Sequence, residues 1–377
     1  MRTLAAVLYE MGSPRPYAEH RPLQVREVEL RPPEAGEVLV EVVAAGLCHS
    51  DLSVIDGSRP RVMPMVLGHE AAGVVRAVGP AVTEVAPGDL VVFSFVPCCG
   101  RCRFCAVGRP ALCERGNAAN ARGCLLDGSC HFHDGQHALH HHLGVSAFSR
   151  WTVAAQESLV RLPNGVPLKV AALFGCAVLT GVGAVLNTAG VPAGTSVAVF
   201  GLGGVGLSAV MGARVCGAHP IVALDVVPWK LQLARELGAT HTVDARQPDL
   251  VEAVRDATGG GAEFAFECAG SEQVLRQAYE ATARGGVTVT VGLPHPSRLL
   301  SLPAVSLTVE ERTLRGSYMG SAVPRRDIPR LIHLWQAGLL PVERLATREL
   351  RLQDINAGFD ALAEGQVARQ LVVMSEG

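Results

Sequence analysis

One glycine-rich turn constrains the fold of this chain more than any other feature. The segment VAVFGLGGVG runs from Val197 to Gly206, after an apolar run and before a helical stretch, Leu207–Val215. In such a turn the first glycine, Gly201, permits a tight bend, Gly203 lets the backbone approach a pyrophosphate, and the last glycine lets helix and strand pack closely. The first N–H groups of the helix are free to bind phosphates. The turn therefore predicts a dinucleotide-binding α/β domain.

A single aspartate indicates which dinucleotide this domain binds. Asp225 stands at the end of the next expected strand, 19 residues beyond Gly206. A carboxylate at that place can bind both hydroxyls of a ribose, and it would repel a 2′-phosphate. The next residues, Val226 and Val227, supply no arginine to accept such a phosphate. We therefore predict NAD rather than NADP, against the alternative of a glycine turn followed by an exposed aspartate.

The residues around this turn alternate between strand-like and helix-like patterns. Helical stretches such as Trp229–Leu237, Asp249–Thr258 and Glu272–Ala283 lie between most of the short apolar runs. The six expected strands are Ser196–Phe200, Pro220–Leu224, Thr240–Val243, Glu263–Glu267, Gly286–Val291 and Thr313–Ser317. Six strands with crossovers of this length predict a doubly wound, six-stranded parallel sheet.

The first half of the chain has a different, β-rich pattern. The apolar or β-branched runs bounded by glycine and proline are Leu4–Tyr9, Glu37–Ala45, Ala72–Val78 and Leu90–Phe95. After Tyr318, two stretches are expected to be helical, Asp327–Ala337 and Asp354–Ala363. A last apolar run, Gln370–Met374, is expected to be a strand that returns to the first half. The pattern therefore indicates a β-rich part and an α/β part.

The composition excludes several classes of partner. The net charge of −2 and a sequence pI near 6.7 provide no field that would attract nucleic acid. The uncharged stretch 170–213 is interrupted by glycines and Pro192, so we expect no membrane-spanning helix in it. Glu10 follows the short apolar start at once, which argues against a signal peptide. We expect a soluble, cytoplasmic protein.

Four cysteines form a closely spaced group. Cys99, Cys102, Cys105 and Cys113 stand in one loop with two, two and seven residues between them. Four thiolates so placed can bind a tetrahedral zinc ion with Zn–S distances of about 2.3 Å. The alternative is a pair of disulfides, but the chain has an odd total of eleven cysteines and no export signal, so metal is favoured. Cys98 is expected to be a bystander, since adjacent residues rarely both face one metal.

Six histidines lie within residues 131–142. Such a segment raises the hypothesis of a further metal site. A solvated, variable loop is the preferred interpretation.

Three further segments carry potential ligands, namely GLCHSD at 46–51, GHE at 68–70 and GCAVLTG at 175–181. Taken alone, Cys48 and Cys176 could be small buried hydrophobic residues, and His69 could be a hydrogen-bonded core histidine. Together with the cysteine loop and the glycine turn, the segments resemble the zinc-dependent alcohol dehydrogenases of the medium-chain dehydrogenase/reductase superfamily. The resemblance covers essentially the whole chain, and the motifs occur in the family's order.

The resemblance implies a fold and an activity. It implies a GroES-like catalytic domain, residues 1–178 completed by 319–377, and a Rossmann-type NAD-binding domain, residues 179–318. The implied reaction is the NAD-dependent oxidation of a primary alcohol to an aldehyde, or its reverse, with one catalytic and one structural zinc ion per chain. Neither the physiological alcohol nor the preferred direction can be deduced from the sequence.

The resemblance also assigns roles to individual residues, according to their positions in the family's motifs. Cys48, His69 and Cys176 match the catalytic zinc ligands, and the four-cysteine loop matches the structural zinc site. Ser50 matches the hydroxyl that takes the alcohol proton, Asp51 the carboxylate that orients the ligand histidine, and Glu70 the acid behind the metal. Expected cofactor-binding residues are His49, Thr180, Gly201, Gly203, Gly204, Val205, Gly206, Asp225, Lys230, Val291, Leu293 and Arg369. Expected substrate-pocket residues are Phe95, His142, Leu143, Leu293 and Met319.

Two departures from the family pattern bear on the activity. Some relatives have a histidine that ends the proton path where this chain has Ser53, so the last proton acceptor stays open. The glutathione-dependent formaldehyde branch, which the chain resembles in length and in the long segment after the cysteine loop, has an arginine where this chain has Asn117. Without that arginine a glutathione carboxylate would bind less well. Oxidation of the glutathione–formaldehyde adduct, S-hydroxymethylglutathione, is therefore the alternative function.

The sequence also bears on two other classes of protein and on the oligomeric state. A zinc-free quinone or enone reductase would not need Cys48, His69 and Cys176, and a non-enzymatic zinc module would not need the dinucleotide turn. The long segment between Cys113 and Cys176 resembles dimeric rather than tetrameric branches of the family. We expect a homodimer formed by edge pairing near Ser301–Thr313.

Overall fold

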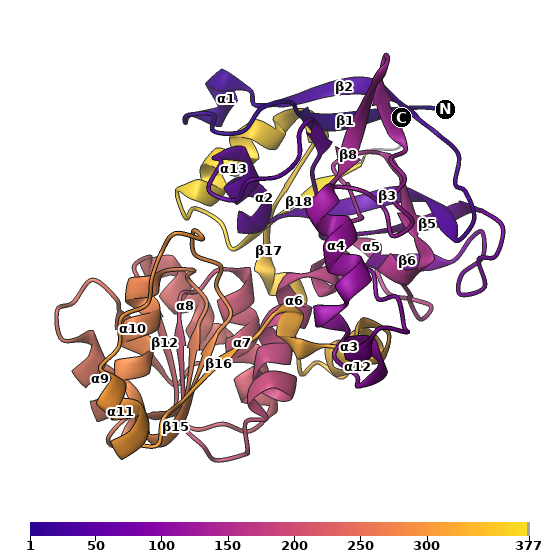
Figure 1. The fold of residues 1–377 in the computed structure, drawn as a ribbon. Coiled ribbons are helices and arrows are strands. Elements are labelled where there is room, and N and C mark those ends of the chain that lie inside the picture. The colour runs from indigo at the N-terminus through magenta and orange to yellow at the C-terminus, as the bar shows by residue number, and fades with distance from the viewer. Residues whose placement is uncertain (375–377) are drawn as a thin grey trace. The chain divides into compact units, whose positions relative to one another are not determined.

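The computed structural model describes residues 1–374 of the chain, which divide into two compact units (Figure 1). The first unit comprises Met1–Cys176, Val323–Ile332 and the described residues from Ala346 on, and the second comprises Ala177–Ala322 and His333–Leu345. Our expectation that 319–377 belongs wholly with the first part differs from this division. The η6 turn (Val342–Leu345) packs against helix α7 (Gly204–Val215), and Arg344 pairs with Glu236, so this segment joins the second unit.

The first unit consists mainly of β-strands, which form a closed barrel and a larger sheet. One set of strands closes into a barrel, in the order β1 (Arg2–Leu8), β2 (Leu23–Leu30), β7 (Phe132–Asp134), β8 (His137–His141) and β4 (Met65–Val66). The larger sheet has the order β10 (Leu159–Arg161), β6 (Leu90–Phe93), β5 (Ala71–Val78), β3 (Glu37–Leu47), β18 (Arg369–Val373) and β17 (Ala346–Leu350), with β9 (Trp151–Ala155) also paired to β3. The four strands expected in the first half are all present.

Strand β18 confirms the expected return of the chain to its first half. It pairs antiparallel with β3, so that Gln370 lies opposite Leu47 and Val372 opposite Ala45. Strand β2 was not expected from the sequence. Its residues LQVREVEL do not keep a strict alternation, because Arg26 and Glu27 are both exposed between Val25 and Val28, so the apolar pattern was too weak to predict a strand.

Short helices connect the strands of the first unit. They are α1 (Tyr17–His20), α2 (His49–Ile55), α3 (Arg103–Ala106), α4 (Glu114–Arg122), α5 (Leu168–Ala172) and α13 (Ile355–Ala363), with the turns η1 (Pro110–Leu112), η2 (Gln156–Ser158), η3 (Leu173–Gly175) and η7 (Leu352–Asp354). Helix α12 (Pro324–Gln336) is divided between the units after Ile332. The apolar barrel core includes Val7, Leu30, Phe132 and Leu139. Within residues 1–374 no single helix is long and apolar enough to span a membrane. Only the two helical segments Leu168–Gly175 and Ala177–Ala189, which are bent against each other, are together long and apolar enough.

The second unit is the doubly wound sheet expected from the sequence. Six parallel strands have the order β13 (His241–Asp244), β12 (Ile221–Asp225), β11 (Val197–Phe200), β14 (Ala262–Glu267), β15 (Thr282–Thr290) and β16 (Thr313–Gly316). This is the 3-2-1-4-5-6 order of dinucleotide-binding folds, with a switch of direction between β11 and β14. In Figure 1 the sheet lies between α7 and α10 (Glu272–Glu280).

The remaining elements of the second unit complete its covering layers. They are α6 (Ala177–Gly183), the π-helical η4 (Ala184–Ala189), α8 (Pro228–Leu237), α9 (Leu250–Thr258), α11 (Ala304–Val309) and η5 (Met319–Ser321). The helix expected at 272–283 ends at Glu280, because Thr282 already begins β15, where its hydroxyl bonds that of Thr288. Val222, Val254, Ala265 and Ala278 are among the core residues packed about this sheet.

The histidine-rich segment is not a solvated loop, and that expectation is wrong. Residues 132–141 form the β7–β8 hairpin of the barrel, and His131, His133, His141 and His142 are buried. Each strand of a closed barrel turns part of its side chains toward the interior, so polar side chains can be buried there as well as apolar ones. Burial and the nearby His131 lower the pKa of His141 to about 3, so it is neutral near pH 7. Among the described residues the only metal-like group that includes one of these histidines is Asp51, His69 and His142.

The four-cysteine loop forms a lobe built on α3, η1 and α4. The sulfur atoms of Cys99, Cys102, Cys105 and Cys113 lie within 4.8 Å of one another, and all eleven cysteines are free thiols, which excludes the disulfide alternative. Backbone N–H groups of Cys99 and Gly116 each donate to Cys113 Sγ at 3.4 Å. Backbone N–H groups of Cys105 and Glu114 lower the pKa of the Cys102 thiol to about 6. Such sulfur atoms suit a tetrahedral zinc ion.

We expect Cys102→Ser to affect stability rather than catalysis. Loss of one thiolate should remove the metal that joins α3 to α4, because an incomplete Cys₄ set binds zinc weakly. The zinc content should fall from two ions to one per chain and the thermal midpoint should fall by several degrees, while kcat of the remaining folded enzyme stays within about threefold. Loss of activity at an unchanged midpoint would contradict this assignment.

Candidate active site

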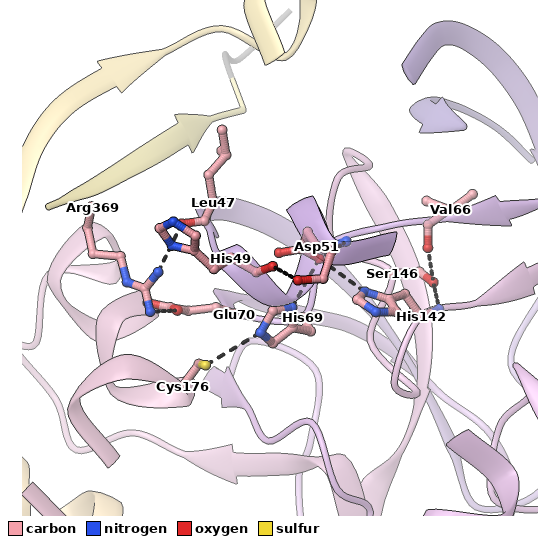
Figure 2. A network of polar contacts seen from close by, with 12 residues as sticks. Leu47, His49, Asp51, Val66, His69, Glu70, His142, Ser146, Cys176 and Arg369 are labelled. Atoms are coloured by element: carbon pink, nitrogen blue, oxygen red, sulfur yellow. Dashed lines mark hydrogen bonds and ion pairs between the residues drawn. The ribbon is translucent and has the colours of Figure 1, made fainter. Parts of the chain in front are cut away.

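Three potential metal ligands from distant parts of the sequence converge inside the first unit. Cys48 caps the start of α2 directly after β3, His69 lies between β4 and β5, and Cys176 follows η3. Their ligand atoms lie within 4.8 Å of one another, and Cys176 Sγ is 3.4 Å from His69 Nε2 (Figure 2). All three side chains are buried. Two sulfur ligands of a tetrahedral zinc stand about 3.8 Å apart when Zn–S is about 2.3 Å, so the spacing suits this metal.

Glycines make this convergence possible. Gly68 has φ +93°, and a Cβ atom there would lie 2.5 Å from the backbone nitrogen of Phe148. A Cβ atom at Gly46 would lie 2.9 Å from the carboxyl carbon of Glu70. The chain can therefore turn into His69 and leave room for Glu70 only because both positions lack a side chain.

Asp51 holds the imidazole of His69 from behind. Its Oδ1 atom is 3.0 Å from His69 Nδ1 and accepts a hydrogen bond from the N–H of Gly68 at 3.1 Å. Burial raises the pKa of Asp51, but the charges and hydrogen bonds of His69 and His142 outweigh it and hold the pKa below its usual value. Ionised Asp51 thus holds Nδ1 of His69, while Nε2 of the same ring faces Cys176 Sγ at 3.4 Å. This is the arrangement expected of a carboxylate that orients a metal-binding histidine.

Two expected pocket residues pack against the same imidazole. The rings of Phe95 and His142 meet the ring of His69 edge to face, with centroids 5.7 and 5.4 Å away. Nδ1 of His142 also lies 3.0 Å from Asp51 Oδ1. The sequence analysis missed this second contact of Asp51. The concentration of histidines before Leu143 was the one signal that could have pointed to it.

A buried ion pair lies on the other side of the three ligands. Arg369 Nη2 is 3.5 Å from Glu70 Oε2, and Arg369 Nη1 donates to the carbonyl of Leu47 at 3.1 Å (Figure 2). Burial raises the pKa of Glu70 to about 7 against the opposing charge of Arg369. Neither oxygen of Glu70 has a hydrogen-bond partner among the described residues. Arg369 was expected to contact a pyrophosphate, and in the structure its side chain is almost fully buried beside Glu70.

The charges of this group of side chains fit a divalent cation. The hydrogen bond with Cys176, together with Arg369 and His69, lowers the pKa of the Cys48 thiol well below its usual value despite burial. Burial lowers the pKa of His69, but Asp51 and Cys48 outweigh it and raise the pKa to about 10. The thiolate of Cys48 and the carboxylate of Asp51, joined by Glu70 when the pH rises above about 7, therefore favour positive charge here. Two thiolates and one imidazole form a zinc donor set that leaves a fourth position open.

Three polar residues of α2, namely His49, Ser50 and Ser53, are at least partly exposed. His49 is exposed and Ser50 is half-buried at the start of the helix. The Ser53 hydroxyl, which stands where some relatives have a histidine, donates to the carbonyl of His49 at 2.8 Å. This hydrogen bond within the helix engages the proton of Ser53.

In the second unit the glycine turn has the geometry that its sequence predicts. Gly201 has φ +92°, and a Cβ atom there would lie 2.9 Å from Ala269. A Cβ atom at Gly206 would overlap the carbonyl oxygen of Gly201. At Gly203, which caps α7, a Cβ atom would meet nothing within 4 Å. The first and last glycines are therefore required by packing, while Gly203 borders open space of the kind a phosphate needs.

Asp225 stands beside this turn at the carboxyl end of β12. Its Oδ2 accepts the N–H of Leu202 at 2.7 Å and its Oδ1 accepts the N–H of Val227 at 2.9 Å. Its neighbour Val226 is exposed, whereas Lys230 is buried with Nζ 5.8 Å from the ring centre of Trp229. The carboxylate is thus fixed at the end of the sheet where ribose hydroxyls bind in this fold.

The other expected cofactor and pocket residues divide between the units. Gly204 and Val205 lie in the first turn of α7, and Gly181, beside Thr180, packs against the carbonyl of Val205. The Oγ1 atom of Thr180 is buried without a partner among the described residues. Val291 and Leu293 follow β15, Met319 begins η5, and Leu143 is buried in the first unit. Sequence analysis missed Glu267, whose carboxylate accepts the N–H of Gly270 at 2.5 Å and the hydroxyl of Thr290 at 3.0 Å, and so holds the loop after β14.

Comparison with known proteins adds to this geometry. A family model described as "Alcohol dehydrogenase GroES-like domain" matches residues 34–164, and one described as "Zinc-binding dehydrogenase" matches residues 204–337. An "NDMA-dependent alcohol dehydrogenase" of Amycolatopsis methanolica is 39% identical over 100% of both chains. An "S-(hydroxymethyl)glutathione dehydrogenase" of Synechocystis sp. is 37% identical over 99% of this chain and 100% of its own.

A solved structure agrees with these matches. The crystal structure of benzyl alcohol dehydrogenase from Acinetobacter calcoaceticus has a TM-score of 0.92, with 33% identity and complete coverage of both chains. The family models and the full-length relatives confirm the resemblance drawn from the sequence. The chain therefore belongs to the zinc-dependent alcohol dehydrogenases of the medium-chain dehydrogenase/reductase superfamily.

Proposed function

We propose that this protein is an NAD-dependent, zinc-dependent dehydrogenase that interconverts primary alcohols, aliphatic or aromatic, and aldehydes. The observation that carries the proposal is the convergence of Cys48, His69 and Cys176, buried and with their ligand atoms within 4.8 Å. A zinc-free reductase would have no use for this donor set. When bound, zinc supplies a Lewis acid that favours loss of the alcohol proton, and NAD supplies the acceptor for the hydride.

The side chains of the first unit bind, orient and transfer protons in this proposal. The two thiols, as thiolates, and Nε2 of His69 hold the metal, while Asp51 keeps the His69 proton on Nδ1, away from it. Ser50, half-buried at the start of α2, takes the alcohol proton. Because the Ser53 hydroxyl donates to the His49 carbonyl, we propose that solvent rather than Ser53 receives the proton from Ser50. Phe95, His142 and Leu143 line the alcohol site on this side.

The second unit binds and orients the dinucleotide. The N–H groups at the start of α7 face the pyrophosphate, and Asp225 accepts the ribose hydroxyls with Lys230 nearby. Fixed by two backbone N–H groups, the carboxylate of Asp225 would repel a 2′-phosphate, which favours NAD. Thr180, Val205, Val291 and Leu293 contact the nicotinamide half, and Leu293 and Met319 add apolar walls. Of the two basic residues that the resemblance assigns to the pyrophosphate, exposed His49 supplies positive charge, whereas Arg369 is buried and paired with Glu70.

Oxidation of the glutathione adduct is the second candidate, because relatives carry that name. In this chain Asn117 stands where that branch has its arginine. Its amide donates to the carbonyls of Cys113 at 2.8 Å and of Ala111 at 3.3 Å. An uncharged side chain engaged within the cysteine lobe offers no partner for a glutathione carboxylate, which favours simple alcohols.

We also propose a homodimer and a cytoplasmic location. All four residues of β16, the edge strand of the parallel sheet, are exposed, and α11 beside it exposes Val305 and Val309. An exposed edge strand with apolar neighbours invites pairing with a second copy. Eleven free thiols suit a reducing compartment. Light scattering should give the mass of two chains, and a mass of four would overturn the dimer.

Replacing one metal ligand should separate catalysis from cofactor binding. We expect Cys48→Ala to lower kcat/KM for alcohol oxidation by at least about a thousandfold, since a Lewis acid contributes several kcal/mol. NAD binding, measured by calorimetry, should change little because most of the residues assigned to the dinucleotide belong to the second unit. Retained turnover in the zinc-depleted variant would contradict the metal assignment.

Two glycine variants should separate dinucleotide binding from folding. Gly203→Ala adds a methyl group to open space, so the thermal midpoint should stay within a few degrees while the Kd for NAD rises by about tenfold or more, about 1.4 kcal/mol. Gly206→Ala forces the helix away from the carbonyl of Gly201, so its midpoint should fall clearly. Equal NAD affinity of Gly203→Ala and the native protein would contradict the placement of the pyrophosphate.

A substrate panel distinguishes the two candidate functions. With NAD, the enzyme should oxidise straight-chain and benzylic primary alcohols without glutathione, and kcat/KM should vary by about 10- to 200-fold per methylene at most because the walls are apolar. Added formaldehyde plus glutathione should give no better substrate. A kcat/KM for that mixture far above every simple alcohol would favour the glutathione-adduct function.

A further inference from the structure

Three consecutive residues of η5 have a left-handed backbone conformation. The φ angles of Met319, Gly320 and Ser321 are +53°, +63° and +48°. Glycine adopts this conformation readily, whereas an L side chain there crowds the backbone. At a methionine and a serine it persists only where neighbouring groups hold it, and such positions cluster at functional sites. Met319 is also the residue to which we assign an apolar wall of the alcohol site.

Gly320 lies directly against the backbone of helix α6. A Cβ atom at Gly320 would overlap the carbonyl oxygen of Leu179 and would lie 2.9 Å from that of Thr180. A Cβ atom at Gly183 would lie 2.7 Å from the carbonyl oxygen of Gly320. The middle of the left-handed segment therefore packs on the part of α6 that carries Thr180, which we assign to the nicotinamide.

A chain of three hydroxyl groups holds the residues on both sides of Met319. Thr188 Oγ1 donates to Ser321 Oγ at 2.9 Å and lies 2.7 Å from Ser317 Oγ. A hydroxyl has one proton, so Thr188, which donates to Ser321, must accept the hydrogen bond from Ser317. Thr188 and Ser317 are only 7% and 8% exposed, and buried hydrogen bonds in a chain strengthen one another. Loss of the central hydroxyl, that of Thr188, would break both bonds.

The backbone that carries Thr188 is itself fixed. Thr188 belongs to η4, a π-helical turn of a kind found frequently at functional sites. Its carbonyl accepts a hydrogen bond from Arg315 Nη1 at 2.6 Å. The side-chain amide of its neighbour Asn187 donates to the carbonyl of Gly320 at 3.3 Å. The hydroxyl of Thr188 is therefore an anchor with a defined place relative to the left-handed segment.

We propose that Thr188 is a positioning residue that sets which alcohols the enzyme prefers, because it holds the left-handed backbone on which Met319 stands. A methionine side chain has three rotatable bonds, so the place of this wall depends on a fixed backbone. Without the Thr188 hydroxyl the segment relaxes, and a bulky alcohol that packs on Met319 binds less well. An alcohol too small to reach the wall is affected little. This inference rests on the proposed oxidation of primary alcohols.

A matched pair of variants tests the hydroxyl alone. Thr188→Val has nearly the shape of threonine and no hydroxyl, whereas Thr188→Ser keeps the hydroxyl and loses the methyl group. Each is assayed with saturating NAD on benzyl alcohol and on ethanol. We expect Thr188→Val to lower kcat/KM about tenfold for benzyl alcohol, mainly through a higher KM, and less than about threefold for ethanol. Thr188→Ser should keep both values within about threefold of the native enzyme, because its hydroxyl can make the same bonds.

A double-mutant cycle tests whether the effect passes through Met319. Met319→Ala removes the wall, so adding Thr188→Val to it should change kcat/KM for benzyl alcohol by less than about twofold, since residues that act through one another are not additive. If Thr188→Val fails to fold, Ser321→Ala replaces it, because this change removes one bond of the same chain at a partly exposed residue. Ser321→Ala should lower kcat/KM for benzyl alcohol about threefold, and this loss should disappear in Met319→Ala.

Three results would overturn the inference. An unchanged kcat/KM for benzyl alcohol in Thr188→Val, or an equal fall for both alcohols, would mean that Thr188 does not act on the wall. An equal fall with and without the Met319 side chain would mean that Met319 is not the route. A fall in Thr188→Ser as large as in Thr188→Val would assign the effect to the methyl group. Failure of the proposed function would look different, because the native protein would then oxidise neither alcohol with NAD.

Discussion

The structure of the active site depends on a concentration of negative charge in a buried place. The thiolate of Cys48 and the carboxylate of Asp51 are almost wholly removed from solvent, and so is Glu70, whose pKa of about 7 leaves it partly ionised. Buried anions are tolerated only when they are paired with positive charge or bind a metal. Arg369 partly offsets Glu70, and the raised pKa of His69, about 10, shows how strongly this environment favours a further cation. A zinc ion bound by two thiolates and one imidazole meets that demand.

The backbone makes this cluster possible through positions without side chains. Gly46 makes room for the carboxylate of Glu70, and Gly68 turns the chain so that His69 faces the two cysteines. The same physical logic recurs in the second unit, where Gly206 lets α7 approach β11 and Gly203 leaves open space. In both units a side chain at Gly46, Gly68 or Gly206 would overlap neighbouring atoms, so only glycine lets the polar groups of the site come this close.

Much of the fold and of the site could be predicted because its signals are local. The turn from Gly201 to Gly206 and the strand–helix alternation around it predict the parallel sheet, and the cysteine spacing predicts a metal-binding lobe. Strand β2 was missed because two successive charged residues, Arg26 and Glu27, interrupt its apolar alternation. The barrel hairpin within residues 131–142 was misjudged because its buried histidines are polar, so composition suggested a loop. The contact of His142 with Asp51 joins residues far apart in sequence, and no local pattern encodes it.

Zinc-edge anomalous diffraction from crystals of the zinc-replete protein with NAD tests the central claim most directly. The account predicts two peaks per chain, one in the four-cysteine lobe and one at bonding distance from Cys48 Sγ, His69 Nε2 and Cys176 Sγ. A single peak in the lobe, with no density among the other three ligands, would contradict it.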